Sequence, residues 1–241
     1  MAELSRKQRE IAHREDLILC AAKDMLVQHG YLGLKMDQIA DQLEYSKGTI
    51  YQHFSNKEEI ILALANRALV KRRELFAQAV TMRKKSRERI GAVGGAAEVF
   101  VEQYPHFFQI EQILRINSVF EKTSQLRRQV MRSCESKCMA IVSGVVRDGV
   151  AQGDVVLPQD CSPEDVVFGL WSTTMGAFGI LANGESLQEL GIKNGLNALR
   201  LNLHMMLDGY AWKPLSTEYD ADKVTNSVKN ELLQFIQTSE N

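Results

Sequence analysis

The fold of this chain is decided by the segment Ser46-Lys47-Gly48-Thr49-Ile50-Tyr51-Gln52-His53-Phe54. Ser46 is a favourable N-cap residue, and a helix over residues 47–54 would place Ile50 and Phe54 on one face, because residues four apart are neighbours on a helix. A second short helix is expected over residues 36–43, where apolar side chains have helical spacing. Two short helices joined by a tight turn predict a helix-turn-helix.

The polar side of this segment suits contact with DNA. The second helix of a helix-turn-helix enters the major groove, and its N-terminal residues reach base edges. Gly48 allows a close approach because it has no side chain, Thr49 can meet a phosphate or a thymine methyl group, and Gln52 can pair with adenine. Hydrogen bonds to phosphates are expected from Lys47, Tyr51, His53 and Lys57.

Several of these side chains also have an alternative role that involves no DNA. The alternative for Tyr51 is packing over the first helix, and the alternative for His53 is bracing the helix that follows. Lys47 and Lys57 are alternatively ordinary solvated charges. Taken together these alternatives do not explain the whole motif, so DNA binding is the preferred interpretation.

Helical spacing of apolar residues continues along almost the whole chain, and no alternating strand pattern of useful length is present. Gly30 is expected to end the first helix, and Asn56 to cap a long helix over about residues 57–82 in a capping-box-like pair with Glu59. Ser162 is expected to cap another helix. Further helices are predicted over about residues 96–103, 106–117, 119–150, 163–182, 194–210 and 224–235. The sequence therefore predicts an all-α fold.

Four pieces of the N-terminal region carry a resemblance to a known family. Gly30-Tyr31, Ile39-Ala40, the segment 46–54 and Asn56-Lys57-Glu58 together resemble the N-terminal signature of TetR/AcrR-type regulators. The resemblance covers about residues 10–65, and beyond them only the helical plan is similar. It implies a three-helix helix-turn-helix DNA-binding domain at residues 1–56, followed by a larger helical ligand-binding and dimerisation domain at residues 57–241.

The same resemblance implies a function. We expect a homodimeric, cytoplasmic transcriptional repressor that binds an inverted-repeat operator in double-stranded DNA. A small apolar or amphipathic molecule is expected to release it from the operator.

Two positions depart from the family pattern. Lys35 stands where the family usually has Thr or Ser at the start of the second helix, and a lysine can meet a phosphate but cannot act as an N-cap. Glu44 stands in the turn where the family usually has Gly, and it would tolerate a left-handed backbone poorly. We therefore expect a slightly different turn and a carboxylate that limits DNA affinity. The complete predicted DNA-binding set is Lys35, Ser46, Lys47, Gly48, Thr49, Tyr51, Gln52, His53 and Lys57.

The helices over residues 163–182 and 194–210 are expected to form a symmetric homodimer. The first carries small residues between large apolar ones, and both surfaces would be large apolar patches if they were left uncovered. A two-fold axis would place the two recognition helices about 34 Å apart, which is one turn of DNA. In the second helix the surface is expected to consist of Leu196, Leu199, Leu203, Met206 and Leu207.

The resemblance also implies a ligand pocket among the C-terminal helices, with the long helix over about residues 57–82 as the lever to the DNA-binding domain. Aromatic and methionine side chains with few fixed charges suit an apolar or amphipathic ligand. The alternative is that these residues are simply core. Arg115 is assigned either to an acidic ligand or to a neighbouring Glu. The candidate pocket residues are Tyr104, Phe107, Phe108, Gln112, Val142, Trp171 and Met175.

The composition is that of an ordinary globular protein, with 45% hydrophobic residues, 24% charged residues and a net charge of −1. Because this charge does not indicate nucleic-acid binding, the argument for DNA rests on where the cations lie. Cys134 and Cys138 share an apolar helix face, which favours a core role over a metal pair. We expect reduced thiols, no metal and no cofactor.

Residues 166–183 contain no charge, but the glycine, serine and threonine among them and the lack of a second such segment argue against a membrane span. We expect a helix that is buried on nearly all sides in a soluble protein.

Two other function classes compete with a regulator. For an enzyme, the sequence contains no GxGxxG, GxxxxGK[ST], GxSxG or HExxH motif, and its histidines show no metal-ligand spacing, so no catalytic residue is predicted. For a helical adaptor that binds only protein, the polar face of residues 46–57 is the contrary argument.

Overall fold

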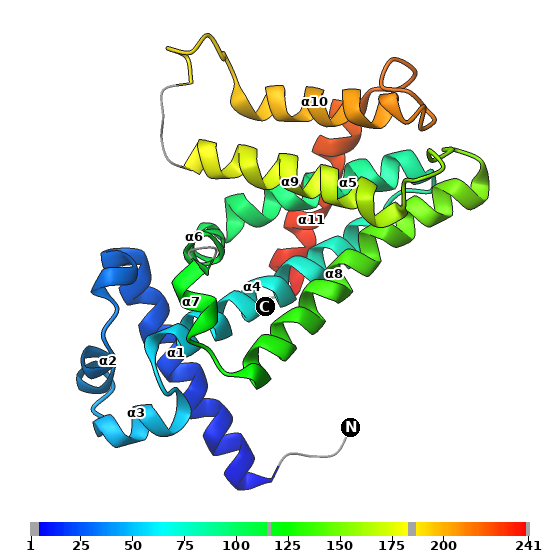
Figure 1. Ribbon diagram of the computed structural model, residues 1–241. Coiled ribbons are helices and arrows are strands. Elements are labelled where there is room, and N and C mark those ends of the chain that lie inside the picture. The colour runs from blue at the N-terminus through cyan, green and yellow to red at the C-terminus, as the bar shows by residue number, and fades with distance from the viewer. Residues whose placement is uncertain (1–4, 115–116, 183–186, 240–241) are drawn as a thin grey trace. The chain divides into compact units, whose positions relative to one another are not determined.

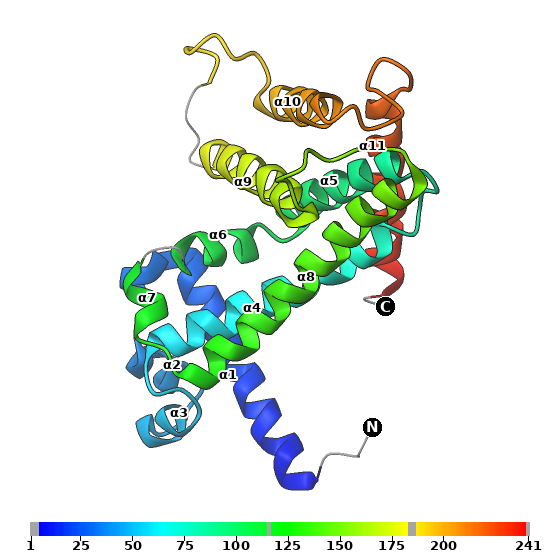
Figure 2. The same cartoon turned by 45° about the vertical axis from the view of Figure 1, so that its right-hand side comes forward.

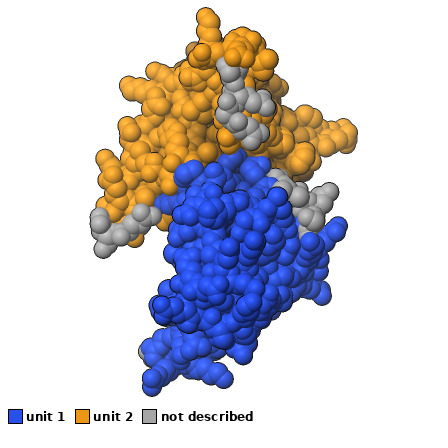
Figure 3. All heavy atoms as spheres, turned by 90° about the vertical axis from the view of Figure 1, so that its left-hand side faces the viewer, with its two compact units in different colours: residues 1–70, 104–134 blue, residues 71–103, 135–241 orange. Residues whose placement is uncertain are grey.

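The computed structural model describes residues 5–114, 117–182 and 187–239, and the helices in these ranges are α1 to α11 (Figure 1; a second view is Figure 2). These ranges contain no strand, so the predicted all-α fold is confirmed. Packing divides the chain into two compact units (Figure 3). Unit 1 comprises residues 1–70 and 104–134, and unit 2 comprises residues 71–103 and 135–241.

Unit 1 contains the predicted helix-turn-helix and the helices that pack on it. Its core includes Ile18, Ile39, Ile50, Phe54 and Ile61, each at most 1% exposed. Later in the chain, α6 packs against α1, and α7 packs against α6. The helices of this unit are α1 (Arg6–Gly33), α2 (Met36–Gln42), α3 (Lys47–His53), α4 (Lys57–Ala79), α6 (Pro105–Leu114), α7 (Asn117–Glu121) and α8 (Gln125–Gln152), of which α4 and α8 continue into unit 2.

Two residues of unit 1 are predicted to mark helix boundaries. Gly30 interrupts the helical backbone with a φ of +65°, which glycine adopts without strain, but α1 does not end there as predicted and continues to Gly33. Asn56 caps α4, because its Oδ1 accepts a hydrogen bond from the backbone N–H of Glu59 at 2.9 Å. The capping box is incomplete, however, because the Glu59 carboxylate binds Ser124 and Arg127 instead.

The single helix predicted over residues 119–150 is wrong. Helices α7 and α8 are separated by a turn over residues 122–124. Ser124 donates its backbone N–H to the buried carboxylate of Glu59, and its hydroxyl accepts from the backbone N–H of Arg127 at 3.4 Å. A carboxylate from a distant helix thus stabilises the break, and the local spacing of apolar residues does not reveal it.

Unit 2 is built from four further helices and the C-terminal parts of α4 and α8. Trp212 is fully buried in its core and donates its indole N–H to the hydroxyl of Ser86 at 2.9 Å. Helix α11 packs along α5, and at Gly95 a Cβ atom would stand 3.5 Å from Thr225, so the two helices approach closely. The helices are α5 (Ser86–Gln103), α9 (Pro163–Ala182), α10 (Gly195–Gly209) and α11 (Ala221–Ser239). The predicted cap of α9 is confirmed, because the Ser162 hydroxyl accepts from the backbone N–H of Asp165 at 3.2 Å.

Helix α9 is not buried on nearly all sides, contrary to the expectation from its composition. Val166, Val167 and Phe178 are buried, whereas Phe168 and Ile180 are exposed. Within the described part of the chain, α9 is the one helix whose length and mean hydropathy of 1.3 would allow it to cross a membrane. The uncharged sequence therefore reflects an apolar side that this chain does not cover by itself.

The neighbouring helix α10 also presents different residues from those expected. Leu199 and Leu207 are buried inside unit 2, whereas Leu201 and Met205 are exposed. Leucine lines both sides of α10, so the spacing of leucines alone could not show which side packs inward.

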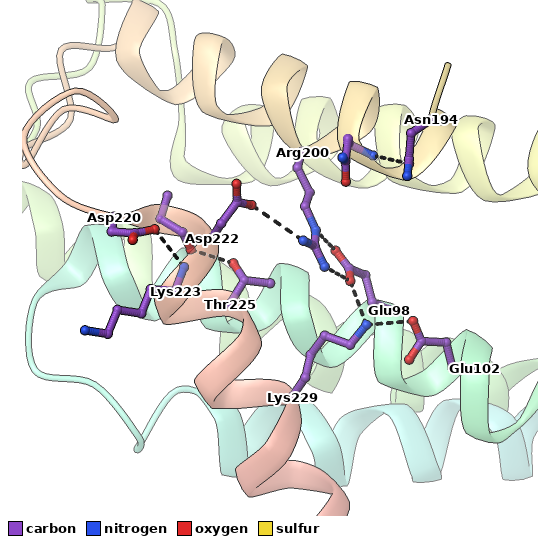
Figure 4. Close-up of polar contacts among 11 residues, drawn as sticks. Glu98, Glu102, Asn194, Arg200, Asp220, Asp222, Lys223, Thr225 and Lys229 are labelled. Carbon is purple, nitrogen blue, oxygen red and sulfur yellow. Dashed lines mark hydrogen bonds and ion pairs between the residues drawn. The ribbon is translucent and has the colours of Figure 1, made fainter. Parts of the chain in front are cut away.

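Two acidic and two basic side chains hold α5, α10 and α11 together (Figure 4). The guanidinium of Arg200 binds both oxygens of Glu98, with Nε–Oε1 at 2.7 Å and Nη2–Oε2 at 2.5 Å. The ammonium of Lys229 bridges Glu98 at 3.0 Å and Glu102 at 2.6 Å. The hydrogen bond to Glu98 raises the pKa of Arg200, and although burial lowers the pKa of Lys229, its hydrogen bonds to Glu102 and Glu98 raise it overall.

The compact units do not coincide with the predicted domain boundary between residues 56 and 57. Residues 57–70 and 104–134 pack with the helix-turn-helix in unit 1. The two units are defined by packing, whereas the predicted boundary separates a DNA-binding domain from a ligand-binding and dimerisation domain. That functional division stays a prediction.

We expect Glu98→Gln to lower the free energy of unfolding by about 3 kcal/mol, because it removes the shared carboxylate from two largely buried cations. Glu98 is only 5% exposed, whereas the carboxylate of Glu102 is 43% exposed. Glu102→Gln is therefore the matched control and should cost less than about 1 kcal/mol. Urea unfolding followed by circular dichroism measures both values, and equal effects of the two substitutions would contradict the assigned roles.

Candidate nucleic-acid interface

The turn between α2 and α3 keeps a left-handed residue. Glu44 has a φ of +54°, and the backbone N–H of Tyr45 donates to the carbonyl of Ala40 at 2.9 Å. The expectation of a different turn is therefore wrong in this respect, since the left-handed position is present and a glutamate occupies it. A left-handed conformation costs a residue other than glycine roughly 1–2 kcal/mol. Glu44 is exposed and precedes Ser46, the N-cap of α3, by two residues.

Ser46 is the N-cap of α3, as predicted. Its Oγ accepts a hydrogen bond from the backbone N–H of Thr49 at 3.1 Å, and the two hydroxyl oxygens lie 2.8 Å apart. One backbone donor of the first turn is thereby satisfied. The two hydroxyls form a small polar surface at the N-terminal end of the helix.

The two sides of α3 differ completely in burial. Ile50 is fully buried, whereas Gln52 and Tyr51 are exposed. A Cβ atom at Gly48 would meet nothing closer than the Oγ of Ser46, at 3.7 Å. The interior of the protein therefore does not require a glycine there, and a close approach from outside is the remaining physical reason for one.

Lys47 forms an ion pair with Asp37, which joins α3 to α2 at the surface. The distance between Nζ and Oδ2 is 2.6 Å, and both side chains are more than half exposed. The hydrogen bond to Asp37 raises the pKa of Lys47. Sequence reasoning missed Asp37, which holds this cation in place on the exposed side.

Lys57 is held against the end of α1. Its Nζ donates to the carbonyl of Tyr31 at 3.0 Å and lies 4.0 Å from the centre of the Tyr31 ring. The phenol of Tyr31 in turn donates to Glu58 at 2.8 Å. Burial, followed by the hydrogen bond to Glu58, raises the pKa of Tyr31. Lys57 therefore has a structural role, and its contact with a phosphate stays a prediction.

The two remaining members of the predicted DNA-binding set differ in exposure. Lys35 is exposed and precedes α2 without a side-chain capping bond, as the sequence led us to expect. His53 is half-buried at the end of α3, and its carbonyl accepts a hydrogen bond from Arg127 at 3.2 Å. Sequence reasoning missed Arg127, which lies 74 residues further along the chain.

The candidate pocket residues are divided between the two units. Tyr104, Phe107, Phe108 and Gln112 belong to unit 1, and Val142, Trp171 and Met175 belong to unit 2. In unit 1 the rings of Tyr104 and Phe107 lie 6.1 Å apart, and the buried amide nitrogen of Gln112 has no hydrogen-bond partner among the described residues. In unit 2 Val142 is buried, whereas Trp171 is exposed and packs against Phe168. Arg115 lies outside the described residues. The pocket stays a prediction.

No group of three or more His, Cys, Asp or Glu side chains within the described ranges is arranged to hold a metal ion. Cys134 and Cys138 are both buried, and Cys134 belongs to the core of unit 1. This placement agrees with the core role that the sequence favoured.

Comparisons with known proteins point to one family. Residues 18–64 match the family model of bacterial regulatory proteins of the tetR family. The HTH-type transcriptional activator FasR of Mycolicibacterium smegmatis is 31% identical over 135 residues, which cover 56% of this chain and 60% of FasR. The fatty acid metabolism regulator protein of Bacillus subtilis is 23% identical over 190 residues, which cover 73% of this chain and 94% of that protein.

Solved structures share the fold. A transcriptional regulator of the TetR/AcrR family from Thermobifida fusca has a TM-score of 0.58 and 22% identity, over 82% of this chain and 98% of that chain. The family model covers most of α1, all of α2 and α3, and the start of α4. The similarity in structure extends over 82% of this chain. These proteins are named as transcriptional regulators.

We expect Gly48→Ala to leave the fold intact and to weaken DNA binding. Alanine favours a helix by up to about 1 kcal/mol over glycine, so the free energy of unfolding should stay equal or rise. A methyl group on the outer side should cost roughly tenfold or more in DNA affinity, because overpacking a close contact costs about 1–3 kcal/mol. Urea unfolding and gel-shift titration measure the two effects.

Gly94→Ala on α5 is the matched control for this substitution, because a Cβ atom at Gly94 meets nothing within 4 Å and therefore has room as well. The control should leave DNA affinity unchanged. Unchanged DNA affinity of Gly48→Ala as well would show that the N-terminal turn of α3 does not approach DNA.

Proposed function

This chain belongs to the TetR/AcrR family of transcriptional regulators, and on that premise we propose that it is a repressor that binds an inverted-repeat operator as a homodimer. The observation that carries the proposal is the outer side of α3, where a Cβ atom at Gly48 would have room and Gln52 is exposed. A buried Ile50 fixes that side outward. The geometry suits a recognition helix in the major groove.

Within this proposal the exposed side chains divide into two roles. Gln52 reads a base edge, because an exposed amide can pair with adenine through two hydrogen bonds. Lys47 binds a phosphate, exchanging part of its pairing with Asp37 for contact with the DNA backbone. The Ser46 and Thr49 hydroxyls lie at the N-terminus of α3, where helix N–H groups favour an anion.

The apolar sides of α9 and α10 support the proposed homodimer. The two helices pack against each other in unit 2. Phe168, Trp171 and Ile180 of α9 are exposed, as are Leu201 and Met205 of α10. Contiguous exposed apolar side chains mark an interaction surface in a soluble protein. A second copy of the same surface is the simplest cover, and it gives the two-fold symmetry that an inverted repeat requires.

The proposed effector is a small apolar or amphipathic molecule that releases the repressor from DNA. The aromatic pair Tyr104 and Phe107 supports this choice, and so does the Gln112 amide nitrogen, which has no hydrogen-bond partner among the described residues. A pocket for such a ligand combines an apolar lining with few polar groups. The relative from Bacillus subtilis is named as a regulator of fatty acid metabolism. Fatty acids and their thioesters are therefore the first class of effector to test.

The experiment that tests the proposal is selection of duplex DNA from a random pool by the purified protein. We expect an inverted repeat whose half-sites are about one helical turn apart. A single half-site would contradict the dimer, and absence of any enriched sequence would contradict the proposed function. A reporter gene placed behind the selected sequence then separates repression from activation, the role in the name of FasR.

We expect Gln52→Ala and Lys47→Ala to weaken binding in different ways. Gln52→Ala should reduce discrimination at particular base pairs by about 1–3 kcal/mol. Lys47→Ala should weaken binding to all sequences alike and lower the slope of log affinity against log salt concentration by about 1. Titration of the selected duplex and its single-base variants at several salt concentrations measures both. The assignment is wrong if Lys47→Ala changes the base preference and leaves the salt slope intact.

A fatty acid that acts as effector should raise the thermal midpoint of the protein and release the selected duplex. Both effects are needed, because a ligand shifts an equilibrium only through different affinities for the two states. Thermal shift and gel-shift assays with a series of chain lengths measure them. A thermal shift without release of DNA would contradict the effector role.

A further inference from the structure

Arg127, in the first turn of α8, contacts three other helices of unit 1 with one guanidinium group. Its Nη2 donates to the carbonyl of His53 at 3.2 Å and lies 3.3 Å from Glu15 of α1. Its Nε lies 2.8 Å from the carboxylate of Glu59 on α4. The guanidinium also lies 4.5 Å from the ring centre of Phe54, the C-cap residue of α3. We call this set the Arg127 clamp.

The Arg127 clamp stabilises the C-terminal end of α3. The last carbonyl groups of a helix have no partner within the helix, and a cation near them is favoured by the helix dipole. At His53 the guanidinium supplies both the hydrogen bond and the positive charge, because its planar fork can bind a carbonyl and two carboxylates at once. The face of Phe54 adds a cation–π contact on the same side.

A second set of contacts fixes the turn that precedes α8 and Arg127. The side-chain amide of Asn56, between α3 and α4, donates to the carbonyl of Lys122 at 3.1 Å. The buried carboxylate of Glu59 accepts from the backbone N–H of Ser124, which begins α8. The turn before α8 is therefore attached to the turn after α3, and Arg127 has little freedom to move without α3.

Helix α8 continues without a break from Gln125 to Gln152, and its residues from 135 onward belong to unit 2. A rotation or shift of α8 would thus move the guanidinium that holds the end of α3. Helix α4 is the other continuous helix that begins in unit 1 and ends in unit 2.

We propose that Arg127 is a positioning residue that fixes the orientation of α3 and makes α8 a second route, beside α4, by which unit 2 acts on base recognition. The proposal rests on the proposed function, in which α3 binds DNA. It assigns sequence discrimination to a residue that need not touch DNA. An arginine that merely contacted phosphate would instead raise affinity for all sequences alike.

The test compares Arg127→Met with Arg128→Met in the full-length protein. Both variants lose one positive charge from the same turn of α8, but the guanidinium of Arg128 lies over Phe120 of α7, 5.9 Å from its ring centre. Each variant is titrated with the duplex that the wild-type protein selects and with a scrambled duplex of equal length and composition. We expect Arg127→Met to lose about tenfold or more of the ratio between the two affinities, and Arg128→Met to keep it within about twofold.

Two further variants separate positioning from folding. Arg127→Lys keeps the charge, but a point charge cannot reproduce the fork, so it should fold normally and still lose part of the ratio. The double variant Glu59→Gln/Arg127→Met removes the buried carboxylate together with its cation, so it should recover thermal stability relative to Arg127→Met alone. It should not recover the affinity ratio. Faster amide exchange at the end of α3 in every Arg127 variant is the direct structural readout.

The outcomes are distinct. Wild-type affinity ratios in the folded Arg127→Lys and double variants would overturn the positioning role. Equal loss of affinity for both duplexes, with a smaller salt slope, would assign Arg127 to a phosphate contact and also overturn it. If the wild-type protein selects no DNA at all, the proposed function fails and the inference fails with it, whereas the first two outcomes leave the proposed function standing.

Discussion

A helix of seven residues is too short to be stable in water by itself, and α3 has only seven. Its conformation and direction are therefore set entirely by what holds it from outside. Ser46 satisfies its first turn, the buried side chain of Ile50 fixes which side faces inward, and the guanidinium of Arg127 binds its last carbonyl. Loss of any one of these restraints would leave the conformation and direction of α3 incompletely fixed.

The side chains on the other side of α3 do not pack against the interior of the protein. A Cβ atom at Gly48 would meet only the Oγ of Ser46, at 3.7 Å, and Gln52 is exposed. Next to this side the turn carries Glu44, whose left-handed backbone and exposed carboxylate both work against stability or anion binding. In this account the interior fixes the orientation of α3, and the outer side is free for recognition.

Local signals were sufficient for much of the fold. The N-caps at Ser46 and Ser162 follow from residue chemistry within one turn of chain, and the structure has them as predicted. Gly30, expected to end the first helix, interrupts the helical backbone there, but α1 continues to Gly33. The break between α7 and α8 could not be predicted in this way, because it depends on Glu59, a residue of another helix. The exposure of α9 was missed for a related reason. Apolar composition indicates that a surface will be covered, but it does not say whether the same chain covers it.

The most direct measurement of the central claim is cleavage of DNA by an iron chelate attached to one introduced cysteine, in protein whose exposed Cys20 and partly exposed Cys161 have been replaced by serine. The chelate is attached through Gln52→Cys on the outer side of α3, and in a second sample through Asn226→Cys on the exposed side of α11. The account predicts strand cleavage at the major groove of each half-site from position 52 and none above background from position 226. Absence of cleavage from position 52 in a complex that still forms would contradict the claim that this side of α3 lies on the DNA.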